Sequence, residues 1–209
     1  MRFSLEWEHN KSRRLFIEAL DFKRLRSAFD SYNGTMTLEE LEAGLDSIRQ
    51  SPKEAGALAL IVRRPQVGER EVLEAAELNL TRGLVGDNWE TRGTPDPEMQ
   101  LNVMNVRAVA LLAQQKERWP LAGDQLYIDL DLSAANLPPG TRLTIGSAII
   151  EVTAKPHLGC KKFAARFGQD AVKWVNSSVG KELKLRGINA KVVRAGVIHV
   201  GDAVRKASM

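Results

Sequence analysis

Apolar side chains in the first fifty residues recur at three- and four-residue steps, the spacing that places them on one face of a helix. The positions with this spacing are Leu15, Ala19, Phe22 and Phe29. Turn residues at 30–34 end the pattern. Thr37, with Glu40 three residues later, is a capping-box signature for a second helix that we expect to end near Gln50. We therefore predict a helical extension over residues 1–52.

After residue 52 the chain changes to short apolar or alternating runs separated by glycine- and proline-containing turns. The runs that we expect to be strands are 57–63, 100–107, 125–132, 141–145, 147–153, 190–193 and 197–204. Helical spacing returns at 68–80, 109–116, 163–167 and 170–179. Short strands joined by glycine-rich turns are typical of a sandwich or a closed barrel. The predicted fold class is mainly β with peripheral helices (α+β), and the predicted domains are 1–52 and 53–209.

Composition and charge exclude several classes of protein. The 209 residues are 44% hydrophobic and 27% charged, so most of the chain is expected to fold. Basic residues are interleaved with acidic ones, so we expect no nucleic-acid partner. No window approaches the ~20 apolar residues of a membrane span, and the first residues hold no apolar stretch of signal-peptide length. A single cysteine fits a reducing compartment. Together, these features predict a cytoplasmic protein with no membrane partner.

The single cysteine, Cys160, is the first candidate for chemistry. Lys161 and Lys162 follow it directly, and a helix is expected to begin there. A helix N-terminus and cationic neighbours lower the pKa of a thiol, and the thiolate attacks, carries sulfur or binds a soft metal. A buried structural cysteine is the alternative, and the local sequence favours neither. His157 lies three residues earlier and could act as its base, but a zinc site would need a second His/Cys cluster that the sequence lacks.

Polar residues elsewhere are weaker candidates. Arg186 precedes a glycine in an expected loop, and arginine suits forked binding of phosphate or carboxylate. Asn102, Asn105 and Arg107 form the polar face of one expected strand. Each of these could line a pocket or face water. No phosphate-loop, dinucleotide-binding or nucleophile-elbow motif is present.

An ordered series of short segments along the second half of the chain carries a family resemblance. These are Gly86–Trp89, Gly123–Ser133, Asn136–Gly146, His157–Phe163, Arg186–Val193 and Gly196–Asp202. The series resembles the MOSC family, the C-terminal module of eukaryotic molybdenum cofactor sulfurases, which is also found as free-standing bacterial proteins. The resemblance covers roughly residues 56–206. It implies a β-barrel-centred fold, preceded here by the helical extension.

The resemblance also implies a cofactor and its site. Cys160 matches the family's cysteine, which is proposed to carry sulfur or to ligate molybdenum. The pterin phosphate of the molybdenum cofactor (molybdopterin) is anionic, and basic and polar residues are its expected partners. The candidate cofactor-binding residues are Lys161, Lys162, Arg186, Asn102, Asn105, Arg107 and His157, with Cys160 as catalytic residue and molybdenum ligand. Asn102 and Asn105 are expected to hydrogen-bond the pterin ring.

Two departures from the family pattern concern the pocket, with the reductase activity that depends on it, and the binding of pyridoxal phosphate. Larger free-standing members often carry His-Gly-Gly after the Gly-Asp turn, whereas Glu90–Pro97 contains no histidine. The aminotransferase-like domain of the fused sulfurases is missing, and no lysine stands in a Schiff-base context, so we expect no pyridoxal phosphate on this chain.

Three functions remain open at this point. The first is a molybdenum-dependent oxidoreductase acting on N-hydroxylated small substrates with an electron-donor protein. The second is a carrier that holds cofactor, or sulfur as a Cys160 persulfide supplied by a cysteine desulfurase. The third is a non-catalytic binding module that uses the helical extension as its partner surface. A homodimer is a further expectation.

Overall fold

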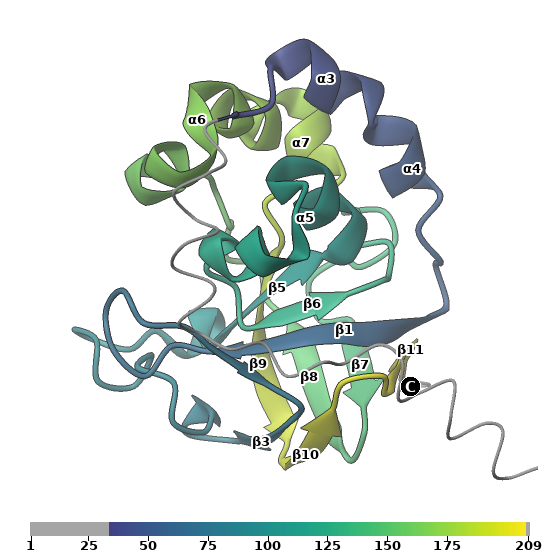
Figure 1. Cartoon of the computed structure of the whole chain (residues 1–209). Helices are drawn as coiled ribbons and strands as arrows, with labels where there is room; N and C mark the ends of the chain where they lie inside the picture. Colours follow the sequence, from purple (N-terminus) through teal and green to yellow (C-terminus); the bar gives the residue numbers. More distant parts are fainter. Residues whose placement is uncertain (1–33, 208–209) are drawn as a thin grey trace, which may run out of the picture. The chain divides into compact units, whose positions relative to one another are not determined.

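Seven strands form a closed β-barrel (Figure 1). The computed structural model describes residues 34–207. The strands are β1 (Ala55–Arg63), β5 (Leu101–Asn105), β6 (Leu126–Ile128), β7 (Arg142–Ile145), β8 (Ala148–Val152), β9 (Ile188–Arg194) and β11 (Ala203–Lys206). Their order is β11-β7-β8-β9-β5-β6-β1, and pairing of β1 with β11 closes the ring. Neighbouring strands are antiparallel except β5 and β6, which are parallel. The predicted class, mainly β with a barrel, is confirmed.

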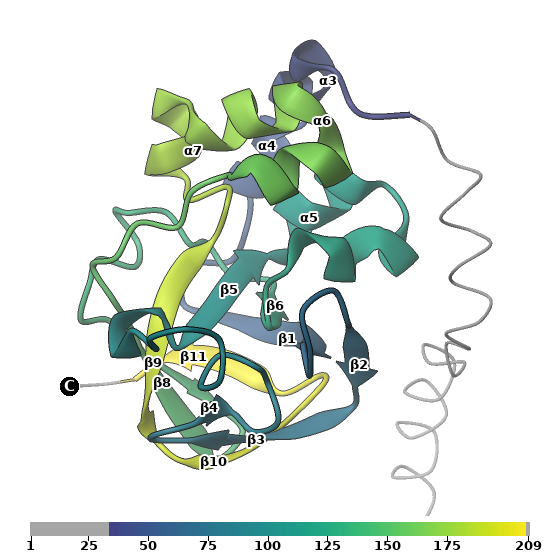
Figure 2. The ribbon, with the colours of Figure 1, turned by 90° about the vertical axis from the view of Figure 1, so that its left-hand side faces the viewer.

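Helices and a second sheet flank the barrel. The α-helices are α3 (Leu38–Ala43), α4 (Leu45–Arg49), α5 (Val106–Ala113), α6 (Lys161–Asn176) and α7 (Ser178–Glu182), and the 3-10 helices are η1 (Pro97–Met99) and η2 (Lys116–Ala122). A small sheet has the order β10-β3-β4, from β10 (Gly196–His199), β3 (Ala75–Asn79) and β4 (Gly83–Leu84). Figures 1 and 2 place the α-helices on one side of the barrel and this sheet on the other. None of the described helices is long and apolar enough to cross a membrane.

Alternation of side chains along the strands produces two hydrophobic cores. On β1, Leu58 and Ile61 belong to the barrel core, whereas Leu60 and Val62 belong to the core that includes the helices. A register shift between Leu58 and Leu60 in the pairing with β6 changes the alternation at that point. The helical core includes Phe163 of α6, so the helix that follows the cysteine is tied to the barrel.

Two sequence expectations about helices were incomplete or wrong. The helix expected at 68–80 is instead β2 (Glu71–Leu73), which pairs with β1, followed by β3, which pairs with β10. The helical spacing in this stretch depended largely on Ala75 and Ala76. Two alanines are weak evidence for a helix, and the hydrogen bonds to neighbouring strands determine the structure here. The capping box of Thr37 and Glu40 is present, but the helix it starts is divided at Gly44 into α3 and α4.

Only part of the expected N-terminal extension can be compared with the structure. The helix expected around residues 15–29 lies outside the described residues. Leu41 of α3 and Ile48 of α4 are buried in the helical core. The domain division at residue 52 stays a prediction.

Candidate functional site

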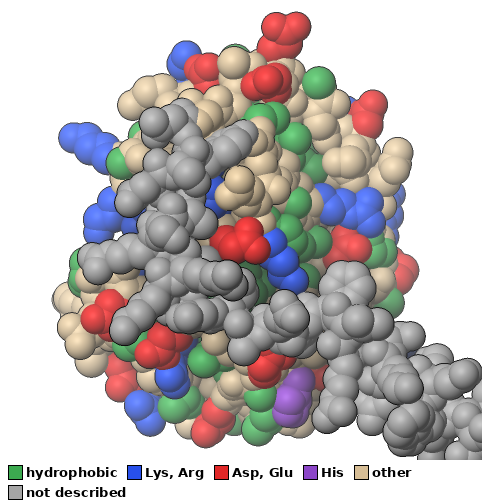
Figure 3. All heavy atoms as spheres, in the orientation of Figure 1, with side chains coloured by type: hydrophobic (Ala, Val, Ile, Leu, Met, Phe, Trp, Pro, Cys, Tyr) green, Lys and Arg blue, Asp and Glu red, His purple; other side chains and the backbone are tan. Residues whose placement is uncertain are grey.

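A cavity of about 540 Å³ lies beside the segment that leads into α6. Six of its lining residues are basic: Arg64, Arg70, Arg92, Lys162, Arg166 and Arg186. None of its described lining residues is acidic. On the face shown in Figure 3, by contrast, acidic and basic side chains are interspersed over the described surface. The lining of this cavity is therefore unlike that face.

Cys160 lines the cavity and occupies the N-cap position of α6. Its side chain is exposed, so the alternative of a buried structural cysteine does not hold. Partial burial raises the pKa of the thiol, but the backbone N–H groups of Phe163 and Lys162 and the charges of two arginines outweigh it, so the pKa is lowered. Those arginines are Arg186 and Arg166. The site thus favours the thiolate.

Hydrogen bonds hold the loop before Cys160 on both sides. The Gly159 N–H donates to Asn176 Oδ1 at 2.9 Å, and the Asn176 amide donates back to the Gly159 carbonyl at 3.2 Å. A Cβ at Gly159 would lie 2.8 Å from Val175 Cγ2, so a larger residue there would push the loop or the Val175 side chain aside. From β9, the Asn189 amide donates to the carbonyls of Lys155 and Pro156. The cysteine is therefore held by distant parts of the chain.

Arg64, directly after β1, is fixed by a buried ion pair. Its Nε and Nη2 donate to the two carboxylate oxygens of Asp87, each at 2.8 Å. Its Nη1 donates to Asn102 Oδ1 at 3.2 Å and to the Gly123 carbonyl at 2.8 Å. The Asn102 amide donates in turn to Asn189 Oδ1 at 2.7 Å. One network thus connects the cavity wall to the residue that holds the cysteine loop.

A second buried pair anchors Arg186. Its Nη1 donates to both carboxylate oxygens of Asp124, at 2.9 and 2.7 Å, and its guanidinium lies 4.8 Å from the centre of the Phe163 ring. The following residue, Gly187, has a φ of 100°, and a Cβ there would collide with the Val103 carbonyl. The positive φ and the nearby carbonyl explain why a glycine follows Arg186.

His157 lies against the same carboxylate. Its Nδ1 is 3.5 Å from Asp124 Oδ1. Burial, together with the charges of Arg186 and Arg64, lowers the pKa of His157 to about 3, although Asp124 acts in the opposite direction. The imidazole is therefore neutral near pH 7 and adds no charge to the cavity.

The remaining basic residues of the lining have no carboxylate partner among residues 34–207. Those that form no ion pair with a carboxylate in the described part of the chain are Arg70, Arg92, Lys162 and Arg166. The Arg166 Nη1 donates to the Leu121 carbonyl and the Arg70 Nε to the Pro120 carbonyl, contacts that orient the side chains without neutralising them. Burial and the charges of Arg166 and Arg64 lower the pKa of Arg70, as mutual repulsion would. A cluster of like charges without counter-ions attracts anions.

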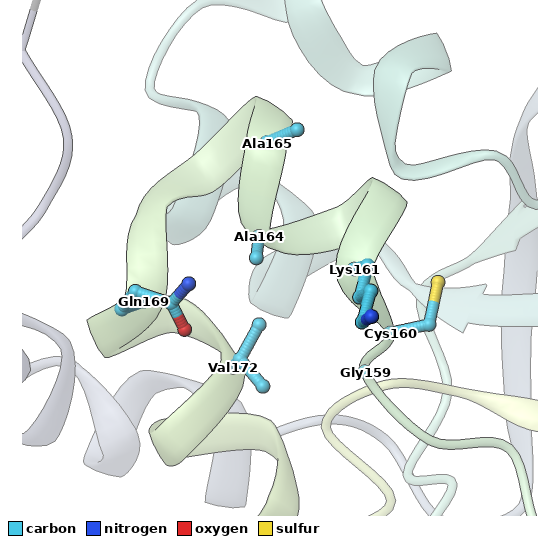
Figure 4. Close-up of a pocket in the computed structure, with 7 residues that line it drawn as sticks. All are labelled: Gly159, Cys160, Lys161, Ala164, Ala165, Gln169 and Val172. Carbon is cyan, nitrogen blue, oxygen red and sulfur yellow. The ribbon is translucent and has the colours of Figure 1, made fainter.

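A second hollow shares Cys160 and Ala165 with the cationic cavity. It is lined by Gly159, Cys160, Lys161, Ala164, Ala165, Gln169 and Val172. In Figure 4 the Cys160 thiol points away from Ala164 and Val172. Lys161 is the single basic residue of its described lining, so the two adjacent lysines of α6 line different hollows.

The structure brings together most of the site residues expected from the sequence. Cys160, Lys162, Arg186, Asn102 and His157 line the cationic cavity. Lys161 lies in the second hollow instead.

Asn105 and Arg107 line neither of these two hollows. The buried Asn105 side chain caps α5 and donates to the Ser51 hydroxyl, while Arg107 pairs with Asp129 at 2.8 Å. Their expected place beside Cys160 is therefore corrected: β5 ends at Asn105, whose side chain begins α5, and the Arg107 side chain contacts Asp129 and the Ser47 carbonyl.

Several lining residues were missed in the sequence. The basic residues Arg64, Arg70, Arg92 and Arg166 lie far apart in the chain. The Gly-Asp pairs at 86–87 and 123–124 were noticed only as part of the resemblance. Each pair supplies the carboxylate that binds one buried arginine. An aspartate directly after a glycine is the sequence feature that could have indicated these two ion pairs.

The model of the MOSC domain family matches residues 90–205, which is more than half of the chain. The chain belongs to the MOSC domain family. The match begins after Arg64, Arg70 and Asp87, so part of the cavity of this MOSC protein comes from outside the matched segment. No curated protein matches the chain.

Solved structures share the fold at low identity. The YuaD protein from Bacillus subtilis is 16% identical with a TM-score of 0.52, over 74% of this chain and 97% of that one. A hypothetical protein is 18% identical with a TM-score of 0.54, over 78% of this chain and 72% of its own. YiiM from Escherichia coli is 20% identical with a TM-score of 0.50, over 73% and 70%. These likenesses concern the fold alone.

Proposed function

We propose that this MOSC protein binds a molybdenum cofactor through the Cys160 thiolate and reduces small N-hydroxylated substrates. The observation that carries the proposal is an exposed thiol of lowered pKa, at a cavity whose described lining holds six basic residues and no acid. A thiolate is a soft ligand, and the cations suit an anionic cofactor.

The residues present fit such a cofactor. Arg70, Lys162 and Arg166 have no carboxylate partner in the described chain and would hold a phosphate group. Asn88 lines the same cavity, and its buried Oδ1 accepts no hydrogen bond within the described chain. A buried acceptor of this kind is costly unless a ligand donates to it, as a pterin ring N–H would.

The metal would have to arrive with ligands of its own. Among the described residues, no group of three or more His, Cys, Asp or Glu side chains could hold a bare metal ion. A single thiolate can complete the coordination of a metal that is already bound by a dithiolene, which is how a molybdenum cofactor carries it.

The protein's part in the reaction would be binding and orientation. When bound, the cofactor would supply the redox chemistry, converting N–OH to N–H with two electrons from a donor protein and two protons, and releasing water. Cys160 would bind the metal, and the arginines would set the position of the cofactor. His157 is neutral near pH 7, so the positive charge of the cavity would come from the arginines and Lys162.

The test is the molybdenum content of the full chain purified from cells that make the cofactor. We expect about one molybdenum per chain, lost in Cys160→Ala and reduced in Lys162→Ala. Lys161→Ala is the matched control, since Lys161 lines the other hollow, and should keep the metal. Metal retained in Cys160→Ala would exclude direct ligation by this cysteine. Reduction of an N-hydroxylated base with an electron donor then tests the activity.

Exposure of the thiol favours a second candidate, a sulfur carrier. The Cys160 thiolate would attack the outer sulfur of a cysteine desulfurase persulfide, and the donor cysteine would leave as a thiolate. Mass spectrometry after incubation with a desulfurase and cysteine should then show one added sulfur atom on the full chain, absent from Cys160→Ala. No added sulfur, with bound molybdenum, would exclude this candidate.

A further inference from the structure

Exposed apolar side chains gather at the cationic cavity. Of the five large apolar side chains that the described chain exposes, Val67, Met99 and Leu158 line this cavity, at 74%, 39% and 49% exposure. They come from the loop after β1, from η1 and from the segment before Cys160. Apolar surface shared by three separate segments at one cavity is typical of a ligand site.

The same cavity carries charge that the described chain does not compensate. Arg64 and Arg186 are paired with Asp87 and Asp124, but Arg92 and Lys162 have no described carboxylate partner. Both of these side chains are exposed. A ligand that satisfied both features would have an apolar body and a negatively charged group.

We propose that this cavity binds small amphipathic anions, with the apolar body against Val67, Met99 and Leu158 and the anionic group near Arg92. As a statement about substrates it rests on the proposed function: it assigns the substrates to N-hydroxylated compounds that carry an apolar ring or chain and an acidic substituent. As a statement about binding it needs no cofactor.

The charge and the apolar surface of the cavity together favour amphipathic anions over three other classes of ligand. A cationic ligand of the same shape would be repelled, because the described lining has no carboxylate to receive it. A compact hydrophilic anion such as inorganic phosphate would leave the apolar side chains in water. An uncharged apolar molecule would bury those side chains but would gain nothing from the cations.

Fluorescence titration of the full chain, purified from cells unable to make the cofactor, tests the binding. The probes are 8-anilinonaphthalene-1-sulfonate and N-phenyl-1-naphthylamine, which share the ring system and differ in the sulfonate. We expect one sulfonate probe per chain, bound at least about ten-fold more tightly than the uncharged probe, with an advantage that shrinks as salt rises. Equal affinity for the two probes would overturn the proposal.

Matched variants locate the probe. Met99→Ser and Leu158→Ser should weaken both probes about three- to ten-fold, since each removes part of an apolar contact. The controls Leu80→Ser and Val197→Ser alter side chains of similar exposure, 55% and 46%, that do not line the cavity, and should change neither affinity.

Charge variants complete the test. Arg92→Gln should weaken the sulfonate probe alone. An equal loss in Val197→Ser, or no loss in Leu158→Ser, would place the probe elsewhere on the molecule and overturn the proposal.

The outcome is separable from that of the proposed function. If the chain holds molybdenum but shows no charge-dependent probe binding, the substrate inference is wrong and the cofactor site stands. If the probe binds as expected and no molybdenum is found, the anion site stands and its assignment to a reductase is wrong.

Discussion

The two hollows that meet at Cys160 are built in different ways. The second hollow is lined by residues between Gly159 and Val172, a single local stretch of chain. The cationic cavity draws its lining from Arg64 to Arg186 and is supported by buried ion pairs with Asp87 and Asp124. Of these two hollows, the one with the many basic residues is the one lined by distant segments, and two of its arginines are held by buried acids.

The largest expected effect comes from removing one of those acids. Asp124→Asn leaves Arg186 buried without its ion-pair partner, and we expect the free energy of unfolding to fall by about 3–5 kcal/mol, measured by urea denaturation. The control Glu90→Gln breaks the partly exposed pair with Arg82 and should cost less than about 1 kcal/mol. Equal losses would mean that the cavity does not depend on its buried acids.

The next effect is a dependence of stability on pH. The pKa of His157 is about 3 in the folded chain and about 6.5 when unfolded, so the unfolded chain binds more protons in between and stability falls as pH falls through this window. Between pH 7 and pH 5 the loss due to this residue should be about 2 kcal/mol. His157→Gln should remove it in urea titrations at both pH values. His199→Gln retains His157 and should lose stability as the unchanged chain does.

A smaller effect concerns the thiol itself. Because the charges of Arg186 and Arg166 help to lower the pKa of Cys160, Arg166→Gln should raise it. The measurement is the pH dependence of the iodoacetamide alkylation rate, which follows the thiolate fraction. We expect the rise in rate to move to higher pH and the rate at pH 7 to fall. Lys161→Gln, in the other hollow, provides the control, and an equal shift there would remove the distinction between the two sides.

The smallest effect compares the two adjacent lysines directly. Iodoacetate is anionic and iodoacetamide is neutral, so the ratio of their rates at Cys160 reports the local potential. Lys162→Gln should lower this ratio about two- to five-fold at low salt, because one nearby charge contributes about 0.5–1 kcal/mol. Lys161→Gln should lower it less. The reverse order would place the reacting thiol in the second hollow.

Much of the barrel could be predicted from local pattern. The runs that became β1, β7 and β8 are apolar or alternating and are bounded by turns, and Gly146 separates the last two as expected. Two strands were missed between residues 71 and 79 because the spacing of their apolar residues resembled that of a helix. In the structure β2 pairs with β1, and β3 pairs with both β4 and β10.

The residues of the candidate site also divide into those that local sequence could identify and those that it could not. Cys160 and Lys162 could be named because the cues are adjacent in sequence: a thiol, two lysines and the start of a helix. Arg70 and Arg166 gave no local cue, since each resembles an ordinary surface arginine until the fold places them at one cavity. Asn105 was misjudged because its side chain caps α5, a role set by where β5 ends.

By itself the sequence determined the strand-rich class, the MOSC resemblance and the cysteine, because periodicity, turn residues and short motifs act over a few neighbouring positions. Only the tertiary structure decided which basic residues surround that cysteine, and which of two adjacent lysines faces them. Those facts depend on closing the barrel between β1 and β11 and on burying two aspartates beneath the cavity. Electrostatic fields depend on distance in space, and a linear pattern of charges does not contain that distance.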